Sequence, residues 1–222
     1  GYRGPVTLID GDPDAPYDRP NLSKDYLAGN APEEWLPLHP KEFYKTQQLE
    51  ILSGVTAKYV DAKARIVRLS DGSTRPYGAL LIATGATPIR LDIPGGDRVL
   101  YLRTLADCRR IIDRARNAKN AVVIGASFIG LEVAASLVTR GLKVHVIAPE
   151  KLPLERILGT ELGTLIRKVH EDKGVRFHFG RTAISVDAKA VVLDGGTRVE
   201  ADLVAAGIGV RPKQALGGSA GV

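Results

Sequence analysis

One stretch near the middle of the chain constrains the fold more than any other. Residues 121–124 are a run of small and β-branched apolar side chains, which predicts a buried parallel strand. A glycine-containing turn follows, and after it comes an apolar pattern with helical spacing that Gly141 ends. Residues 143–147 predict a second strand. Strand, turn, helix and strand in this order make up the βαβ unit that binds a dinucleotide.

The turn has the pattern Gly125-x-Ser127-x-x-Gly130. Gly125 allows the chain to leave the strand sharply, and Gly130 allows the helix to approach the strand closely. Ser127 stands where the dinucleotide fingerprint has its middle glycine, which lets backbone amides approach a pyrophosphate at the positive end of a helix. A tight turn that binds no ligand remains the alternative. A serine hydrolase elbow is excluded, because it would need glycine at the position of Ile129.

The composition excludes several other classes of protein. The 222 residues are 44% apolar and 25% charged, as in ordinary globular chains, and no apolar run approaches the ~20 residues that span a bilayer. The single cysteine, Cys108, is typical of a reducing compartment, so we expect a cytoplasmic protein without a membrane partner. The net charge of +6 is modest, and no Lys/Arg cluster is interleaved with aromatic residues, so no nucleic-acid partner is expected. No metal site is predicted.

The rest of the chain alternates between predicted strands and helices, with a boundary signal at residues 94–96. Predicted strands cover residues 5–9, 54–60, 65–69, 79–86, 175–179, 182–186, 190–193, 197–200 and 201–205, and predicted helices cover 41–48, 104–117 and 160–173. We expect residues 79–86 to be buried and to end in a turn where backbone touches a ligand. Asp10 or Asp12, after the first strand, stands where an acid binds a ribose, although a turn rich in Asp, Gly and Pro explains the same residues.

Four motifs occur in a fixed order: Pro16-Tyr17-Asp18-Arg19-Pro20 with Leu22-Ser23-Lys24, Ala83-Thr84-Gly85, Gly125-x-Ser127-x-x-Gly130-Leu131-Glu132, and Gly207-Ile208-Gly209-Val210-Arg211-Pro212. With this series the chain resembles the FAD-dependent pyridine nucleotide oxidoreductases, specifically their ferredoxin/rubredoxin reductase and apoptosis-inducing-factor-like branch. The resemblance implies an α/β fold with a Rossmann-like NAD(P)-binding domain and part of a second Rossmann-like domain that binds FAD. The expected division is 1–102 for the partial FAD-binding domain, 103–213 for the NAD(P)-binding domain and 214–222 for the return to the FAD-binding domain.

The resemblance also implies an activity. Proteins of this branch pass hydride from a reduced nicotinamide to FAD, and the flavin then gives electrons, one at a time, to an iron–sulfur protein. We therefore expect an NAD(P)H-dependent flavoprotein reductase whose partner is a ferredoxin or a Rieske-type protein. An apoptosis-inducing-factor-like protein, which binds flavin and NAD and acts through an interaction, is the alternative.

Site residues follow from the same resemblance, in two groups. Positions that match contacts to FAD are Asp12, Arg19, Lys24, Ala83, Thr84, Gly85 and, displaced by one residue, Arg90. Positions that match contacts to the nicotinamide cofactor are Gly125, Ser127, Ile129 and Gly130 at the phosphate turn, Glu132 near the nicotinamide, and the backbone strip Gly207, Ile208 and Gly209 beside it. Lys24 and Glu132 are the predicted catalytic residues.

Two departures from the family pattern concern chemistry and specificity. The disulfide-reducing relatives have a cysteine pair where this chain has the run from Arg19 to Lys24, so the disulfide-reductase mechanism is excluded. The ribose acid of the nicotinamide domain is expected near position 148, which is Ala148. Glu150 could reach round to the ribose and would favour NADH, whereas Arg156 could meet the 2′-phosphate of NADPH. We expect NADH.

A third departure is an absence. The family's first glycine fingerprint, which holds the FAD pyrophosphate, and its closing Gly-Asp segment are both missing from this sequence, which also contains no methionine. We therefore expect the chain to be the middle of a longer reductase, with an incomplete FAD domain. The plainest alternative for the chain itself is an inactive NAD-binding fragment.

Overall fold

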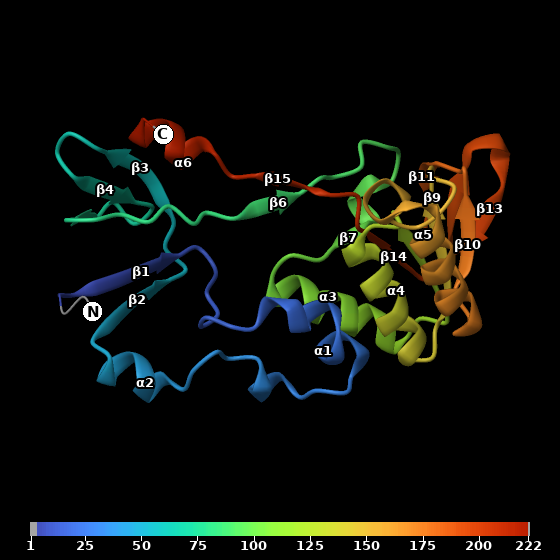
Figure 1. The fold of residues 1–222 in the computed structure, drawn as a ribbon, viewed down its shortest axis with the longest axis horizontal. Coiled ribbons are helices and arrows are strands. Elements are labelled where there is room, and N and C mark those ends of the chain that lie inside the picture. The colour runs from blue at the N-terminus through green and yellow to red at the C-terminus, as the bar shows by residue number, and fades with distance from the viewer. Residues whose placement is uncertain (1–3, 222) are drawn as a thin grey trace. The chain divides into compact units, whose positions relative to one another are not determined.

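The computed structural model describes residues 4–221, whose packing divides them into two compact units (Figure 1). The first unit comprises the described residues up to Asp18, Leu36–Thr87, and those from Arg211 onward. The second unit comprises Arg19–Trp35 and Pro88–Val210. The expected functional division at residue 102 stays a prediction, because packing alone does not assign a cofactor to either unit.

The second unit is built around a five-stranded sheet in which every neighbouring pair of strands is parallel. Its order is β10 (Arg176–Phe179), β9 (Lys143–Ala148), β8 (Asn120–Ile124), β14 (Leu203–Ala206) and β7 (Leu100–Tyr101). Val122 and Val123 of the central strand β8 point to opposite faces of the sheet, and both are 0% exposed. Burial on both faces explains why this strand appears in the sequence as a continuous apolar run. The predicted parallel α/β architecture is confirmed for this unit.

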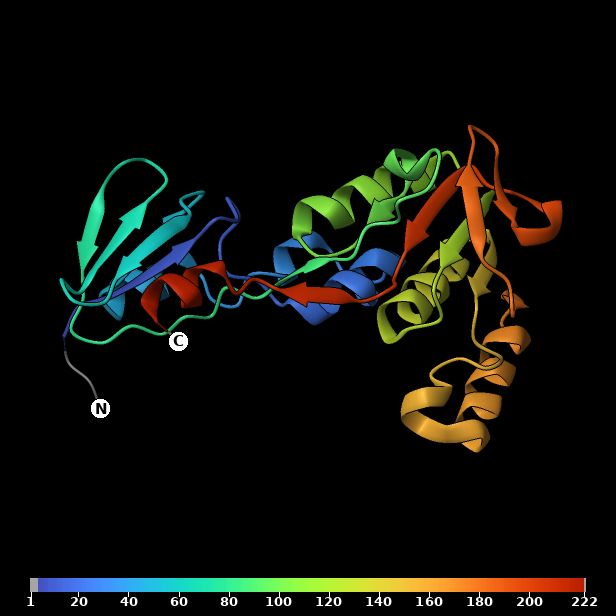
Figure 2. The same ribbon diagram turned by 90° about the horizontal axis from the view of Figure 1, so that it is seen from above.

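The longer helices of the second unit are α3 (Leu105–Arg116), α4 (Phe128–Thr139) and α5 (Glu155–Asp172). Thr104 begins α3 as predicted, because its side chain and that of Asp107 each accept a hydrogen bond from the other's backbone N–H. Non-helical backbone at Gly159 separates a first turn of α5 from the regular helix. Figure 2 shows α5, in orange, extending away from α3 and α4.

Smaller elements complete the second unit. They are η1 (Arg19–Ser23), α1 (Asp25–Ala28), η2 (Glu33–Trp35), η3 (Gly96–Arg98), η4 (Asp194–Gly196) and an antiparallel sheet of β11 (Ala183–Val186), β12 (Ala190–Leu193) and β13 (Arg198–Glu200). Val191 and Leu193 of this small sheet share one buried cluster with Val122 and Ile147 of the parallel sheet. The small sheet therefore covers one face of the parallel sheet. Its three strands lie close to the positions predicted for them, residues 182–186, 190–193 and 197–200.

The first unit has less regular structure. Its elements are β1 (Val6–Asp10) parallel to β2 (Leu49–Ser53), α2 (Lys41–Thr46), an antiparallel sheet of β3 (Ala57–Asp61), β4 (Ile66–Leu69) and β5 (Thr74–Pro76), and α6 (Ala215–Ala220). Val60, Val67 and Leu69 form its buried cluster. β6 (Ala86–Pro88) pairs with β15 (Val210–Pro212). The strands predicted over residues 54–60 and 65–69 are confirmed as β3 and β4, and β5 adds a third strand beside β4.

The buried strand predicted over residues 79–86 is wrong for most of its length. Only Ala86–Pro88 forms a strand, and Leu81 is 86% exposed. The apolar run has the composition of a strand that is covered on both faces, but such burial requires neighbouring elements on each side. No strand of residues 4–221 pairs with residues 79–85, and the composition of the run could not reveal which neighbours it has.

No helix within residues 4–221 combines the length and the apolar character needed to cross a bilayer.

Candidate functional site

The turn between β8 and α4 has the geometry that its glycine pattern predicts. Gly125 has φ +102°, which disfavours any other residue, and its N–H donates to the carbonyl of Ile147 at 2.8 Å. Ser127 is the N-cap of α4, and its Oγ accepts a hydrogen bond from the Gly130 N–H at 3.2 Å. β8 therefore leads across a short turn to the positive end of α4.

Three glycines meet where α4 begins. A Cβ added at Gly130 would lie 2.1 Å from the carbonyl oxygen of Gly125, and one added at Gly207 would lie 2.7 Å from the Gly130 nitrogen. A Cβ added at Gly125 would lie 2.4 Å from the Gly207 oxygen. In each case the added Cβ would collide with a backbone atom, so none of the three positions has room for a side chain. The Ser127 hydroxyl stabilises this arrangement of the three glycines by donating a hydrogen bond to the Gly207 carbonyl at 2.6 Å.

The backbone amides predicted to receive a diphosphate are only partly available. The two ends of the predicted range, Gly125 and Gly130, are hydrogen-bonded within the protein, as described above. The amides of Phe128 and Ile129 lie in the first turn of α4, where helix geometry provides no intrahelical acceptor. Their side chains are half exposed. The candidate anion site is therefore narrower than expected and is centred on residues 126–129.

Lys24 and Glu132, the two predicted catalytic residues, lie together. Lys24 Nζ is 3.0 Å from Glu132 Oε1, and Ser23 Oγ donates to Glu132 Oε2 at 2.5 Å. The side chains of Lys24 and Glu132 are 51% and 31% exposed, so the pair is open to a ligand and to water. A pair with this exposure adds little to stability. Its effect is to hold a carboxylate and an ammonium group at defined places beside the first turn of α4.

Residues that the sequence did not single out hold this pair in position. Ser136 of α4 is buried, and its Oγ donates to the carbonyl of Ser23 at 2.7 Å. Arg140, at the C-terminal end of α4, donates to the carbonyl of Leu27. Ser23 and Glu132 are 109 positions apart, so no local pattern could indicate these contacts. The only sequence signal is a serine at position 136 on an otherwise apolar helix face.

The two arginines predicted to contact FAD each have a protein partner. The guanidinium group of Arg19 donates to the carbonyl of Arg103. Arg90 lies over the ring of Tyr101, with its Cζ 5.0 Å from the ring centroid, a favourable cation–π distance. An anion that binds either arginine would have to share it with this partner.

The end of β9 carries no acid, as predicted. Ala148 is its last residue, and its carbonyl accepts a hydrogen bond from the Arg181 N–H at 3.2 Å. Glu150 follows as a half-buried residue whose carbonyl accepts from the Gly180 N–H at 3.0 Å, and Arg156 is exposed in the first turn of α5. Within residues 4–221, no ion pair involves either Glu150 or Arg156.

The strip after β14 lies against the glycine turn, whereas its predicted place beside the nicotinamide stays a prediction. The Gly207 N–H donates to the carbonyl of Ile124 at 2.9 Å, which extends the pairing of β14 with β8 by one residue. Ile208 packs on the buried cluster between the two sheets. Gly209 has φ +108°, and its carbonyl accepts from the Ile89 N–H at 3.0 Å.

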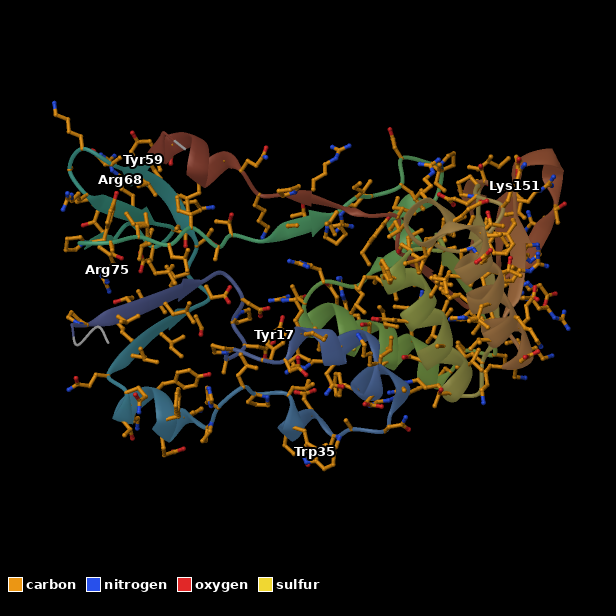
Figure 3. All side chains as sticks on the ribbon, in the orientation of Figure 1. Tyr17, Trp35, Tyr59, Arg68, Arg75 and Lys151 are labelled. Carbon is orange, nitrogen blue, oxygen red and sulfur yellow. The ribbon has the colours of Figure 1, made fainter. Side chains whose placement is uncertain are left out.

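The remaining predicted FAD contacts belong to the first unit: they are Asp12, Ala83, Thr84 and Gly85. Tyr17, which is labelled in Figure 3, donates a hydrogen bond from its hydroxyl to Asp12 Oδ2 at 2.7 Å. Asp12 therefore helps to form a hydrogen-bonded turn. Thr84 Oγ1 donates to the carbonyl of Lys213 at 2.7 Å, and the Lys213 N–H donates to the carbonyl of Gly85 at 2.9 Å. These contacts fix the backbone at residues 84–85.

Thiol and metal chemistry find no support in the described part of the chain. Cys108 is 0% exposed, and its Sγ donates to the carbonyl of Leu22 at 3.1 Å. Burial raises the pKa of the Cys108 thiol to about 12, so this cysteine is structural. Among residues 4–221, no group of three or more His, Cys, Asp and Glu side chains is arranged to bind a metal ion.

Comparison with known proteins identifies the family to which this geometry belongs. The family model described as pyridine nucleotide-disulphide oxidoreductase matches residues 2–222. Monodehydroascorbate reductase 4 of Arabidopsis thaliana is 35% identical over 96% of this chain and 48% of its own length. The ferredoxin–NAD(+) reductase component of an anthranilate 1,2-dioxygenase system of Burkholderia cepacia is 34% identical over 98% of this chain and 55% of its own length.

A solved structure that is similar to this chain is also that of a reductase. Putidaredoxin reductase, in its covalent complex with putidaredoxin, has a TM-score of 0.94 and 33% identity, and the match covers 100% of this chain and 56% of the reductase chain. The chain thus spans about half the length of the proteins it matches. With a family model that covers nearly every residue, this chain belongs to the pyridine nucleotide-disulphide oxidoreductase family.

Proposed function

We propose that this chain is part of an NADH-dependent flavoprotein reductase that passes electrons from NADH through FAD to a ferredoxin or Rieske-type iron–sulfur protein. The observation that carries the proposal is the ion pair between Lys24, at the start of α1, and Glu132 of α4, the helix that begins at the glycine turn. The named activity of the Burkholderia relative and the partner in the putidaredoxin reductase structure support it.

The residues of the glycine turn fit a dinucleotide. The contacts among Gly125, Gly130 and Gly207 exclude side chains, so a diphosphate can approach bare backbone at this point. The first-turn amides of α4 then donate to the phosphate oxygens, and the positive end of the helix favours their negative charge. Ser127 holds the turn and the strip at Gly207 together before any ligand arrives.

Glu132 and Lys24 are proposed to act at the nicotinamide end of the site. When bound, the nicotinamide supplies a hydride, and the flavin accepts it and releases electrons singly. The carboxylate of Glu132 is held by Lys24 and Ser23, so it can accept a hydrogen bond from a ligand without moving. Pre-organisation of this kind lowers the entropy that binding must remove.

The FAD contacts are proposed from the charge and exposure of the matching residues. Arg19 and Lys24 are exposed cations, which suit the phosphates of FAD. Asp12 Oδ2 accepts from the Tyr17 hydroxyl and Oδ1 accepts from the Asp14 N–H, and each oxygen can accept one more hydrogen bond, so a ribose hydroxyl can still bind there. Residues 83–85 offer a fixed and partly exposed backbone.

NADH rather than NADPH is the proposed donor. Glu150 lies two residues beyond the end of β9, where a carboxylate favours the ribose hydroxyls and disfavours a 2′-phosphate. We expect Glu150→Gln to lower the preference for NADH over NADPH, measured as the ratio of the two kcat/KM values. If the wild type instead uses NADPH better than NADH, and Arg156→Gln abolishes this preference, the assignment to NADH is wrong.

The first experiment is calorimetric titration of this chain with NADH, because residues 4–221 contain the whole glycine turn. We expect binding by the wild type and loss of binding in Gly130→Ala. The same chain mixed with FAD and NADH tests its completeness: catalytic bleaching of the flavin would contradict the expectation that its FAD domain is incomplete.

The second experiment uses a longer protein that contains this chain. We expect NADH-driven reduction of a ferredoxin at many turnovers per second, and a lower kcat in Glu132→Gln. Slow turnover with a long-lived complex of flavin and nicotinamide would favour the apoptosis-inducing-factor-like alternative. A small radical acceptor that is reduced far faster than any ferredoxin would contradict the iron–sulfur partner.

A further inference from the structure

Three polar side chains follow one face of α4 at intervals of one helical turn. They are Glu132, Ser136 and Arg140, and each stands four positions after the one before. Residues four apart on a helix lie on the same face, so the three form a row that ends at the C-cap of α4. The row contacts residues 23–29, which contain the short helix α1 and are called the α1 segment below.

The first two members of the row hold the beginning of the α1 segment. Glu132 Oε2 accepts a hydrogen bond from Ser23 Oγ at 2.5 Å, and Glu132 Oε1 lies 3.0 Å from Lys24 Nζ. One turn further along α4, the buried Ser136 Oγ donates to the carbonyl of Ser23 at 2.7 Å and lies 3.3 Å from the carbonyl oxygen of Lys24. Ser136 therefore fixes the backbone of the two residues whose side chains contact Glu132.

Arg140 holds the other end of the α1 segment. Its guanidinium group donates to the carbonyl of Leu27, and its Nη2 lies 3.4 Å from the carbonyl oxygen of Tyr26. α1 has only four residues, and a helix of that length is not stable by itself in water. The conformation of the α1 segment therefore depends on the contacts that neighbouring helices make with it.

We propose that Ser136 and Arg140 are positioning residues, which couple docking of the α1 segment on α4 to binding of a reduced nicotinamide dinucleotide. The inference rests on the proposed function, because that function assigns the nicotinamide end of the ligand to Glu132. Ser136 and Arg140 do not touch the ligand. They act through the backbone of the α1 segment, and so through the contact of Lys24 with Glu132.

The coupling arises because Glu132 serves two partners. While the α1 segment is docked, Lys24 and Ser23 order the carboxylate before the ligand arrives. When the segment leaves α4, the ligand itself must order this 31% exposed side chain, and that ordering lowers the affinity. The nicotinamide ligand therefore binds the docked state more tightly, and by linkage it stabilises that state by the same factor.

The first test compares NADH with ADP-ribose, which lacks the nicotinamide. In calorimetric titration of this chain, Ser136→Ala/Arg140→Gln should raise the dissociation constant for NADH about two- to tenfold, which corresponds to a docked fraction of about one half to one tenth. ADP-ribose should bind this double variant and the wild type equally, because it has no carboxamide for Glu132 to bind. Ser136→Ala alone should act in the same direction with a smaller effect, and it replaces the double variant if that one does not fold.

The matched control is Thr139→Ala/Arg116→Gln. The Thr139 hydroxyl donates to the carbonyl of Ala135 within α4 at 3.1 Å, and the Arg116 guanidinium at the end of α3 lies 3.6 Å from Asp113. Neither contact involves the α1 segment, so the control removes the same two kinds of group elsewhere. It should leave both dissociation constants unchanged, and circular dichroism checks that every variant remains folded.

Hydrogen exchange of the α1 segment tests the coupling in the other direction. The Ala28 N–H donates to the carbonyl of Lys24 at 2.8 Å, and the Gly29 N–H donates to that of Tyr26 at 3.1 Å, so both amides report opening of the segment. NADH should slow their exchange in the wild type, whereas ADP-ribose should not. Without ligand, exchange should be faster in Ser136→Ala/Arg140→Gln than in the wild type.

The outcomes separate this inference from the proposed function. Equal weakening of NADH and ADP-ribose in the double variant would show that the row only stabilises α4, and would overturn the coupling. Unchanged NADH binding in that variant, or exchange that NADH does not slow, would overturn the coupling and leave the proposed function standing. A wild type that does not bind NADH, or a Glu132→Gln variant that binds it unchanged, would contradict the proposed role of Glu132 and the inference with it.

Discussion

The two units differ sharply in how far they bury their strands, although similar apolar runs predicted strands in both. In β8 of the second unit, Val122 and Val123 are 0% exposed, whereas Val6 and Leu8 in β1 of the first unit are 43% and 44% exposed. β8 lies between β9 and β14, but β1 has β2 as its only described partner. The burial of a strand is therefore decided by its neighbours and not by its own composition.

The same difference extends to the cores. The second unit joins its two sheets through one large buried cluster, whereas Val60, Val67 and Leu69 make up the buried cluster of the first unit. Because stability follows the apolar area removed from water, we expect the second unit to resist unfolding more strongly than the first. Four predictions test this comparison.

Truncation of the buried helix face should have the largest effect. Leu137 of α4 is 0% exposed, and Leu137→Ala should lower the free energy of unfolding by about 2–5 kcal/mol. Leu81 is 86% exposed, and Leu81→Ala should change it by less than about 0.5 kcal/mol. Urea unfolding followed by circular dichroism measures both. Equal losses would show that residues 79–86 are buried after all and that the contrast between the units is false.

A methyl group at the glycine contact should come next. In Gly130→Ala the new Cβ would lie 2.1 Å from the Gly125 oxygen, and the resulting shift should destabilise the second unit by about 1–3 kcal/mol. Gly218 of α6 is the control in the first unit, since an added Cβ there meets nothing within 4 Å. Gly218→Ala should be neutral or stabilising by up to about 1 kcal/mol. A harmless Gly130→Ala would contradict the close approach of β8 and α4.

Loss of a helix cap should have a smaller effect. Thr104→Ala removes the acceptor for the Asp107 N–H at the start of α3 and should lower stability by about 0.5–2 kcal/mol. In the first unit, the exposed Thr46 of α2 donates to the carbonyl of Glu42, and Thr46→Ala should stay within about 0.5 kcal/mol. Thermal unfolding of the two variants measures both losses of stability. A larger loss in Thr46→Ala than in Thr104→Ala would contradict the expected difference between the two units.

The smallest expected effect is a dependence on pH within the second unit. His145 Nδ1 lies 2.8 Å from His178 Nε2, and burial lowers the pKa of both imidazoles below the ordinary 6.5. The positive charge of Arg176 lowers the pKa of His145 further, and that of Arg181 lowers the pKa of His178. The unfolded chain therefore binds these protons more tightly, so this contribution to stability is present above pH 6.5 and is lost as the pH falls below it.

Far-UV circular dichroism follows unfolding of the second unit, because that unit contains the longer helices α3, α4 and α5. Urea midpoints above and below pH 6.5 should differ in the wild type. The difference should shrink in the double variant His145→Gln/His178→Gln. An unchanged pH dependence in that variant would show that other titratable groups cause the pH dependence of stability.

The comparison also shows how much of the site local sequence could predict. Gly125 and Gly130 were assigned to a tight turn with close helix packing, and the structure places both in that geometry. The same pattern predicted more free backbone amides in the turn than the structure has. The sequence could not show that Ser127 Oγ would accept a hydrogen bond from the Gly130 N–H. The pairing of Lys24 with Glu132 was not predicted, although each residue was chosen separately.

The sequence by itself determined what is encoded within a few neighbouring residues. The capping box at Thr104, the positive φ of Gly125 and the parallel strand at residues 121–124 all depend on local sterics, hydrogen bonds and apolar periodicity. Only the tertiary structure decided that Leu81 is exposed and that Ser23 meets Glu132 across 109 positions. Such contacts depend on the path of the whole chain, because burial and long-range pairing belong to the neighbours that folding brings together.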